Sequence, residues 1–445
     1  MRLVILGGGG FRVPVVHGRL LDDPQRLVAE LVLHDVDRSR LEAIRAVLDQ
    51  QARDRPWRPR LCVTTDLDQA LDGADVVFSA VRVGGLQGRA LDERIALRHG
   101  LLGQETVGVG GISFALRTVP VVLTVARRLA AVAPAAWLIN FTNPAGVVTE
   151  AMSAVLGDRV VGICDSPVAL FRRVAAALGV GMDRAWFDYV GLNHLGWLRR
   201  VLVAGRDELP RLLDDPEALA GVEEGRLFGA SWLRTLGAIP NEYLHYYYFA
   251  REVREQVLAQ EITRGEFLRD QQDRFYEQVR GATDRALQLW TEVRQERERT
   301  YFAEGRAVAG SGKRATEDLT GGGYEEVALR LLRAVVTGHR DTLVLNVRNR
   351  GVVAGLDPDA VVEVPCQVDG NGPRPVALGP VEPHFLGLMQ QVKAADRATI
   401  AAAVHRSRRD ALLAMAAHPL VDSVRAAERV LDDYVAALPG LADLA

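Results

Sequence analysis

Four consecutive glycines, Gly7–Gly10, stand directly after the short apolar run Leu3–Leu6. A helical pattern over residues 12–21 and a second apolar run, Glu30–His34, follow them. Glycines at the turn from a first strand into a helix let a pyrophosphate approach the backbone at the positive end of the helix. This order of elements predicts a parallel sheet that binds a dinucleotide.

Asp35 directly follows the second run and strengthens this prediction. A carboxylate at that place accepts hydrogen bonds from the ribose hydroxyls of NAD and repels the extra phosphate of NADP. The usual GxGxxG spacing, however, would need a glycine where Arg12 stands. A tight turn in an α/β protein that binds no nucleotide is the alternative. The expected NAD contacts are Gly7, Gly8, Gly9, Gly10, Phe11, Asp35 and Arg40.

The first domain is expected to span residues 1–168, where short apolar runs alternate with helical patterns. The predicted strands are Leu3–Leu6, Glu30–His34, Leu61–Thr64, Asp75–Val81, Ala136–Asn140 and Val160–Cys164, and the predicted helices cover residues 12–21, 38–53, 66–71, 117–132 and 145–156. Strands that are almost continuously apolar are typical of a parallel sheet buried on both faces. Their alternation with helices predicts an α/β fold with a Rossmann-like, doubly wound parallel sheet.

The pattern changes after Pro167, and a length of 445 residues favours two domains. Residues 169–445 are expected to form an α+β domain packed on the first. Its predicted elements are a helix over Val168–Leu178, a strand starting at Asp188–Gly191, mostly helix over 207–300, a Gly-rich loop over Tyr301–Tyr324, β-like runs at Thr342–Val347 and Ala360–Val364, and a helical tail from residue 383.

The composition excludes two classes of partner. Lys and Arg total 54 against 57 Asp and Glu, a formal charge of −3, whereas a protein that binds nucleic acid is expected to be basic. The most apolar helical stretch, Val119–Val132, is interrupted by Arg127 and Arg128, so we expect no membrane partner. Three cysteines and no apolar signal region fit a cytoplasmic protein.

Polar side chains follow the fifth and sixth predicted strands, where doubly wound sheets hold ligands. Asn143 can place an amide beside a nicotinamide or a substrate, or it can form an Asx turn before Pro144. Cys164 ends the sixth strand, and His194 follows a later one. A thiolate and an imidazole are a plausible pair of metal ligands, but a core cysteine and a structural histidine are the alternative.

Tyrosines and arginines supply further candidates. Four tyrosines lie within Tyr243–Tyr248, a density typical of a core or an interface. A tyrosinate base would need a nearby cation, because the reference pKa is about 10. Arg89 and Arg264 suit an anionic substrate, since the guanidinium fork matches phosphate, whereas Arg94 and Arg98 are as readily explained as surface salt bridges.

Together these segments resemble glycoside hydrolase family four, the glycosidases that depend on NAD and a divalent metal, over most of the chain. The resemblance rests on Gly7–Gly10, His34–Asp37, Arg89–Glu93, Gly103–Thr106, Asn143–Gly146, Cys164–Pro167, Asn193–His194, Tyr243–Tyr247 and Val361–Cys366. Within the family, the chain is most similar to the 6-phospho-β-glucosidases. The resemblance implies a lactate/malate-dehydrogenase-like architecture and a homodimer or homotetramer.

The resemblance also implies a route to glucose 6-phosphate and an aglycone. NAD takes a hydride from carbon 3, Tyr243 removes the proton on carbon 2, the bond at carbon 1 breaks by elimination, water adds, and NADH returns the hydride. By the same match, Cys164 and His194 bind the metal, usually Mn²⁺. Arg89, Asn143, Asn193 and Arg264 hold the small phosphorylated glucoside or disaccharide.

Asp165 leaves open whether the substrate is an α- or a β-glucoside. In the family, an Asp directly after the ligand cysteine is associated with α-specific enzymes, where it is the proposed acid for the leaving group. Ser166-Pro167 and Gly84–Leu86 look more like the β-type sequences. We therefore expect a 6-phospho-β-glucosidase; a 6-phospho-α-glucosidase with Asp165 as general acid is the alternative. Two further functions fit the same fold, an NAD-dependent 2-hydroxy-acid dehydrogenase and a non-catalytic nucleotide sensor.

Overall fold

The computed structural model describes residues 1–311 and 323–444, and all thirteen strands in these ranges belong to one sheet. Six strands form its parallel part in the order β3-β2-β1-β4-β5-β6. They are β1 (Arg2–Leu6), β2 (Glu30–His34), β3 (Arg60–Thr64), β4 (Val76–Ser79), β5 (Trp137–Asn140) and β6 (Val160–Gly162). The strand order reverses between β1 and β4, which opens a crevice at the carboxyl ends of the strands. The predicted Rossmann-like sheet is confirmed.

The helices of this half agree with the predicted ranges except at two places. Four lie within two residues of the prediction: α1 (Val13–Leu21), α2 (Arg38–Gln51), α3 (Leu67–Leu71) and α6 (Ala145–Leu156). Helix α4 (Gly85–Arg98) was not predicted, because its buried face carries charged residues that hide the apolar period.

Helix α5 (Gly108–Val132) begins well before the predicted start at residue 117. Glycines are poor helix formers, so the sequence pattern hides this first part. Tertiary packing prevails there, since a Cβ on Gly110 would come within 2.5 Å of the Gln104 carbonyl oxygen. By length and composition α5 could cross a membrane, but 83% of its most apolar window is buried inside the fold.

The second half extends the same sheet with antiparallel strands. These are β7 (Ala185–Leu192), β8 (Leu195–Val203), β9 (Arg206–Asp207), β10 (Ile239–Pro240), β11 (Asp341–Arg348), β12 (Val361–Asp369) and β13 (Gly372–Pro375). Strand β11 pairs with β6 only at Asn346 and Gly162, and β12 pairs with β7 only at Glu363 and Gly191. Since β12 and β7 both belong to the second half, β11 and β6 form the only strand pair among the described residues that joins the two halves edge to edge.

Helices cover this second half. They are α7 (Ser166–Leu178), α8 (Leu209–Leu213), α9 (Pro216–Gly221), α10 (Glu223–Phe228), α11 (Ala230–Leu236), α12 (His245–Tyr248), α13 (Ala250–Leu258), α14 (Arg264–Gly281), α15 (Ala286–Arg299), α16 (Ala303–Val308), α17 (Tyr324–Thr337), α18 (Pro383–His405), α19 (Arg408–Ala417) and α20 (Val424–Ala437). The predicted loop over 301–324 is wrong where α16 forms, and its residues 312–322 lie outside the described part of the chain.

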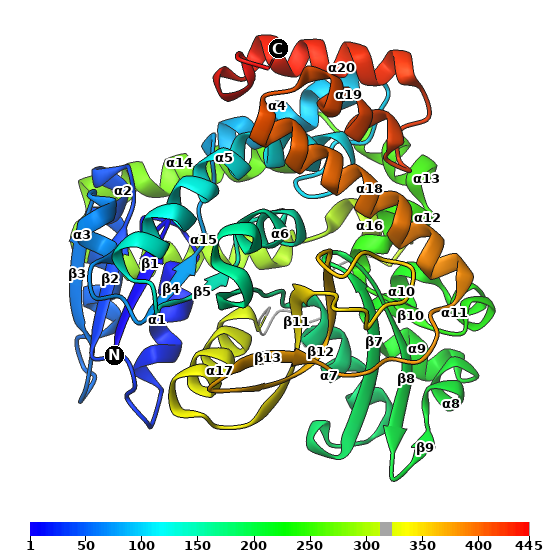
Figure 1. The fold of residues 1–445 in the computed structure, drawn as a ribbon, viewed down its shortest axis with the longest axis horizontal. Coiled ribbons are helices and arrows are strands. Elements are labelled where there is room, and N and C mark those ends of the chain that lie inside the picture. Colours follow the sequence, from blue (N-terminus) through cyan, green and yellow to red (C-terminus); the bar gives the residue numbers. More distant parts are fainter. Residues whose placement is uncertain (312–322, 445) are drawn as a thin grey trace.

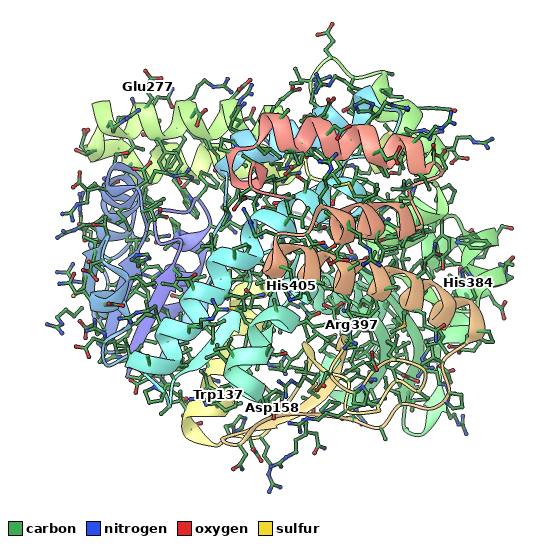
Figure 2. The ribbon with its side chains drawn as sticks, turned by 45° about the horizontal axis from the view of Figure 1, so that its top comes forward. Trp137, Asp158, Glu277, His384, Arg397 and His405 are labelled. Carbon is green, nitrogen blue, oxygen red and sulfur yellow. The ribbon has the colours of Figure 1, made fainter. Side chains whose placement is uncertain are left out.

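The C-terminal helices α18–α20, orange to red, lie over α4 and α5, and β7 and β8 lie on the opposite side from β2 and β3 (Figure 1). Helix α18 runs between His384 and His405 with Arg397 along its length (Figure 2). Arg397 and Lys393 donate to the buried carboxylate of Glu150 in α6, at 3.0 and 2.9 Å. These ion pairs tie the C-terminal helices to the parallel half.

A buried ion pair fixes α4 against α5. The guanidinium of Arg117 donates two hydrogen bonds to Asp92, at 2.7 and 2.8 Å, and both side chains are at most 3% exposed. Replacing Arg117 by Met leaves a buried carboxylate without its partner, so we expect a loss of about 3–5 kcal/mol in the free energy of unfolding. Arg55→Met, which breaks a surface pair with Asp22, should cost less than about 1 kcal/mol.

Urea unfolding followed by circular dichroism measures both losses. Equal shifts of the two midpoints would contradict the assignment of Arg117 and Asp92 as the pair that holds α4 and α5 together.

Candidate active site

One cavity of about 980 Å³ lies at the carboxyl ends of β1, β2, β4, β5 and β6. It is closed by residues of the second half, among them Tyr243, Arg264 and Tyr301. The predicted site residues that line it are Gly7, Gly10, Phe11, Asp35, Arg40, Arg89, Asn143, Cys164, Asp165, Asn193, His194, Tyr243 and Arg264. The structure therefore brings together almost all of them.

Gly8 and Gly9 do not line this cavity. Their amides face β2: Gly8 donates to the His34 carbonyl at 2.8 Å, and Gly9 donates to the Asp35 carboxylate at 3.0 Å. A Cβ on Gly8 would lie 2.6 Å from the Cβ of Leu33, so glycine is required for this close approach. These two glycines shape the turn rather than face a ligand.

The Gly10 amide donates to the Gly7 carbonyl at 2.8 Å, whereas the amides of Phe11 and Arg12, which follow it, have no hydrogen-bond acceptor among the described residues. Both residues line the cavity and directly precede α1, which starts at Val13. Free amides at the positive end of a helix suit a pyrophosphate. Asp35, held by the Gly9 amide, lies beside this turn and faces the cavity with Arg40.

The candidate metal ligands come from both halves. Cys164 follows β6, and His194 lies in the turn between β7 and β8 with a positive φ of 61°. The Nδ1 atom of His194 bonds the hydroxyl of Thr106 at 2.7 Å, which leaves Nε2 for a ligand. Burial lowers the pKa of His194 to about 3, so the imidazole is neutral, as metal coordination requires.

The cysteine completes a partial ligand set. Burial raises the pKa of the Cys164 thiol well above its ordinary value, so the thiolate needs a cation to form. No group of three or more His, Cys, Asp or Glu side chains within residues 1–311 and 323–444 could hold a metal. The pair therefore fits a divalent cation whose remaining ligands come from a bound molecule or water.

Tyr243 lies flat against His194, with ring centroids 3.7 Å apart and an angle of 3° between the planes. The hydroxyl of Tyr301 donates to that of Tyr243 at 3.2 Å. Burial raises the pKa of Tyr243 well above its ordinary value. A tyrosinate therefore requires a cation nearby, and the candidate metal ligand is in direct contact with its ring.

The arginines that line the cavity differ in their hydrogen-bond and ion-pair partners. Arg89 is compensated, since it donates to Glu93 at 2.8 Å and to Glu105 at 2.7 Å. Arg12 lies 3.9 Å from the carboxylate of Asp165. In contrast, Arg94 and Arg98 pair with Glu266 and Asp433 at half-exposed positions, so both are surface salt bridges.

Arg264 and Arg297 have no acidic partner among the described residues. Arg264 donates to the Thr300 hydroxyl at 2.7 Å and to the backbone carbonyl of Arg297 at 3.2 Å. Burial, together with the charges of Arg12 and Arg264, lowers the pKa of Arg297 to about 9. Arg297 was not among the predicted site residues, because it lies in a charge-rich helix, α15, whose pattern does not distinguish it from its neighbours.

Asn143 and Asp165 occupy the edges of the cavity. The residue that precedes α6 is Pro144, and no side chain caps that helix, so Asn143 is available to a ligand. Asp165 precedes α7 without capping it, and its carboxylate also faces the cavity.

Glu242 is a second cavity residue that was not among the predicted site residues. It accepts a hydrogen bond from the Ser166 hydroxyl at 2.7 Å and lies in the cavity wall next to Tyr243. Burial, followed by the charge of Glu224, raises the pKa of Glu242 to about 7.

This raised pKa predicts a pH-dependent stability. An acid with a folded pKa near 7 and an unfolded pKa near 4.5 takes up a proton on folding, so the parent loses stability as the pH rises through this window. Glu242→Gln removes that loss and should gain up to about 3 kcal/mol on the parent between pH 5 and pH 8. Thermal melts without added metal or nucleotide measure the difference; a difference independent of pH would refute it.

Two sequence profiles match the chain. Residues 2–180 match the profile described as Family 4 glycosyl hydrolase, and residues 189–421 match that of the Family 4 glycosyl hydrolase C-terminal domain. A Bacillus subtilis (strain 168) protein named "Probable 6-phospho-beta-glucosidase" is 33% identical, over 98% of this chain and 96% of the relative. The 6-phospho-alpha-glucosidase of Leptotrichia buccalis is 30% identical, over 98% of this chain and 97% of the relative.

Solved structures are similar over 90% or more of the chain. The Thermotoga maritima 6-phospho-beta glucosidase with manganese, NAD⁺ and glucose-6-phosphate has a TM-score of 0.81 at 26% identity, covering 98% of both chains. A lactate dehydrogenase from a Medee basin deep-sea metagenome library has a TM-score of 0.53 at 15% identity, covering 90% of this chain and 98% of that one. The predicted dehydrogenase-like architecture is thereby confirmed.

Proposed function

The chain belongs to glycosyl hydrolase family 4, and from this premise we propose that it hydrolyses 6-phospho-β-glucosides to glucose 6-phosphate and an aglycone. The reaction proceeds through oxidation at carbon 3, elimination, addition of water and re-reduction. NAD and a divalent cation, Mn²⁺ in the relative of known structure, are the proposed cofactors.

One observation carries this proposal. Residues Gly7–Arg12, here called the glycine turn, and Asp35 suit NAD, and they share a cavity with Cys164, His194 and Tyr243. A simple dehydrogenase needs only the glycine turn and Asp35, which bind its NAD. A thiol, a neutral imidazole and a tyrosine beside the same cavity add a metal site and a proton acceptor, which elimination requires.

Each cavity residue has its own role in the proposed reaction. Bound NAD would accept the hydride of carbon 3 and return it at the end, and a cation on Cys164 and His194 would supply positive charge for the enediolate oxygens. Tyr243, whose ring lies on His194, removes the proton of carbon 2. Asn143 and Asn193 orient the sugar, and the carboxylate of Glu363 accepts from Asn193 at 3.2 Å and holds it in place.

The cavity also supports recognition of the 6-phosphate. Arg264 and Arg297 are guanidinium groups without an acidic partner among the described residues, and they lie in one wall. A phosphate dianion would offset the repulsion between them. Glu93 and Glu105 occupy two of the five N–H donors of Arg89 and fix its position, and the remaining N–H groups of Arg89 contact the sugar.

A 6-phospho-α-glucosidase is the second candidate, and one observation favours it. Asp165 faces the cavity beside Cys164, where it can donate a proton to the leaving oxygen. Relatives of both anomeric types align over 98% of the chain.

We further propose that the chain has two functional domains. Residues 1–168 mainly bind NAD, and residues 169–445 mainly make the contacts to the substrate, the metal and the other subunits of the oligomer. A homodimer or homotetramer in the cytoplasm follows from the family resemblance. A reducing compartment suits this proposal, because it keeps Cys164 as a thiol.

A panel of α- and β-linked chromogenic glucosides, each with and without the 6-phosphate, tests the function in the presence of NAD and Mn²⁺. We expect turnover of the phosphorylated β-glucoside, no net NADH, and loss of activity with a chelator. Net NADH equal to product would instead indicate a dehydrogenase, turnover of the α-glucoside alone would indicate the second candidate, and no turnover would indicate a nucleotide sensor.

Arg297→Met tests phosphate recognition. Loss of a hydrogen bond to a charged group should raise KM for the phosphorylated glucoside about 10- to 100-fold. The KM for the glucoside without phosphate should not change, and neither should either KM in Arg98→Met, which alters a surface pair only. An equal rise for both glucosides would show that Arg297 does not bind the phosphate.

A further inference from the structure

Three side chains of the second half donate hydrogen bonds to backbone carbonyls of the glycine turn. The Tyr276 hydroxyl of α14 donates to the Gly9 carbonyl at 2.7 Å. The indole N–H of Trp290 in α15 donates to the Phe11 carbonyl at 2.8 Å. The Tyr324 hydroxyl of α17 donates to the Arg12 carbonyl at 3.0 Å. We call Tyr276, Trp290 and Tyr324 the carbonyl clamp.

The donors of the clamp are buried and come from three separate helices. The exposed fractions of Tyr276, Trp290 and Tyr324 are 8%, 4% and 3%. A buried hydroxyl or indole N–H costs free energy unless it finds an acceptor, so each of these side chains is held where its carbonyl lies. The turn follows β1 of the parallel sheet, but helices α14, α15 and α17 of the second half hold its carbonyls in place.

The clamp determines where one free amide of the turn, that of Arg12, points. A peptide unit is planar and trans, so its carbonyl and its N–H point in opposite directions. Trp290 draws the Phe11 carbonyl toward α15, and the N–H of Arg12 in the same peptide unit must point the other way. That N–H has no acceptor among the described residues.

Ring contacts and a further hydrogen bond also fix the position of the same turn. The ring of Phe11 packs edge-on against Phe275, at 5.2 Å between centroids, and lies 6.1 Å from that of Trp290. The Tyr276 hydroxyl also accepts a hydrogen bond from Arg40 at 3.1 Å, and the Arg40 guanidinium lies 4.3 Å from the ring centroid. The clamp therefore orders two of the expected cofactor contacts, Phe11 and Arg40, together with the turn.

We propose that Tyr276, Trp290 and Tyr324 are positioning residues that preorganise the glycine turn for the pyrophosphate of NAD. Helix α15 also carries Arg297 in the cavity wall, so the same helix connects the cofactor turn with the candidate phosphate site. This inference rests on the proposed function, since it requires that the chain binds NAD. It makes the affinity for a cofactor bound mainly by residues 1–168 depend also on three side chains of the second half.

Tyr276→Phe and Tyr324→Phe test the clamp, because each removes one hydroxyl and keeps the ring. Isothermal titration of the metal-free protein with NAD should give a dissociation constant raised about fivefold by either change and about 25-fold by both, as expected for one hydrogen bond each. The KM for the phosphorylated glucoside at saturating NAD should stay unchanged. The matched control is Tyr434→Phe, which removes an equally buried hydroxyl bonded to the Asp92 carbonyl at 2.6 Å, away from the cavity.

Melting temperatures and dissociation constants together distinguish a positioning role of the clamp residues from a merely structural role. Melting temperatures of all variants are measured in parallel, and lowered melting temperatures with an unchanged dissociation constant for NAD would overturn the clamp. A rise in the dissociation constant in Tyr434→Phe equal to that in the clamp variants would overturn it as well. If the parent chain does not bind NAD, the proposed function fails together with the clamp, whereas equal binding by parent and variants refutes the clamp alone.

Discussion

The buried carboxylate of Glu363 in β12 is the contact on which the geometry of the site depends. It accepts hydrogen bonds from Asn346 at 2.9 Å, Tyr189 at 3.1 Å and Asn193 at 3.2 Å. These donors belong to β11, to β7 and to the turn that follows β7. Burial raises the pKa of Glu363 to about 7, and the three donors counter part of that effect. A single acceptor thus joins the antiparallel strands to the turn that carries the candidate metal ligand.

A glycine makes the junction between the two halves possible. A Cβ on Gly162 would lie 2.4 Å from the Thr149 hydroxyl oxygen and 2.8 Å from the Cβ of Asn346. Only a residue without a side chain lets β11 pair with β6 at this point. Because Cys164 follows Gly162 by two residues, this close pairing also brings the cysteine to the cavity that His194 lines.

Sequence reasoning succeeded where local patterns carry the information. The glycine turn, Asp35 and the six parallel strands follow from short-range order, and Asn143 and Cys164 stand at strand ends, where ligands are expected. The role of Tyr243 as the base came instead from the resemblance to the family. Sequence reasoning failed where burial contradicts local preference. Helix α4 buries charged side chains, and the first turns of α5 are rich in glycine, so neither has the apolar period of a typical helix. Glu242 and Arg297 line the cavity, but neither belongs to a sequence motif that identifies it as a site residue.

The sequence alone determined the fold class, the dinucleotide turn and the set of residues able to supply a thiolate, an imidazole and a tyrosine. Only the tertiary structure decided which of them share one cavity and which charges remain uncompensated there. Arg89 is paired with two carboxylates, and Arg297 has none within hydrogen-bond distance in the part of the chain that the structure describes. This difference depends on contacts across helices that lie far apart in the chain. The physical reason is that desolvation and pairing act through space, so the chemistry of a guanidinium or a carboxyl is settled by its neighbours in the folded protein.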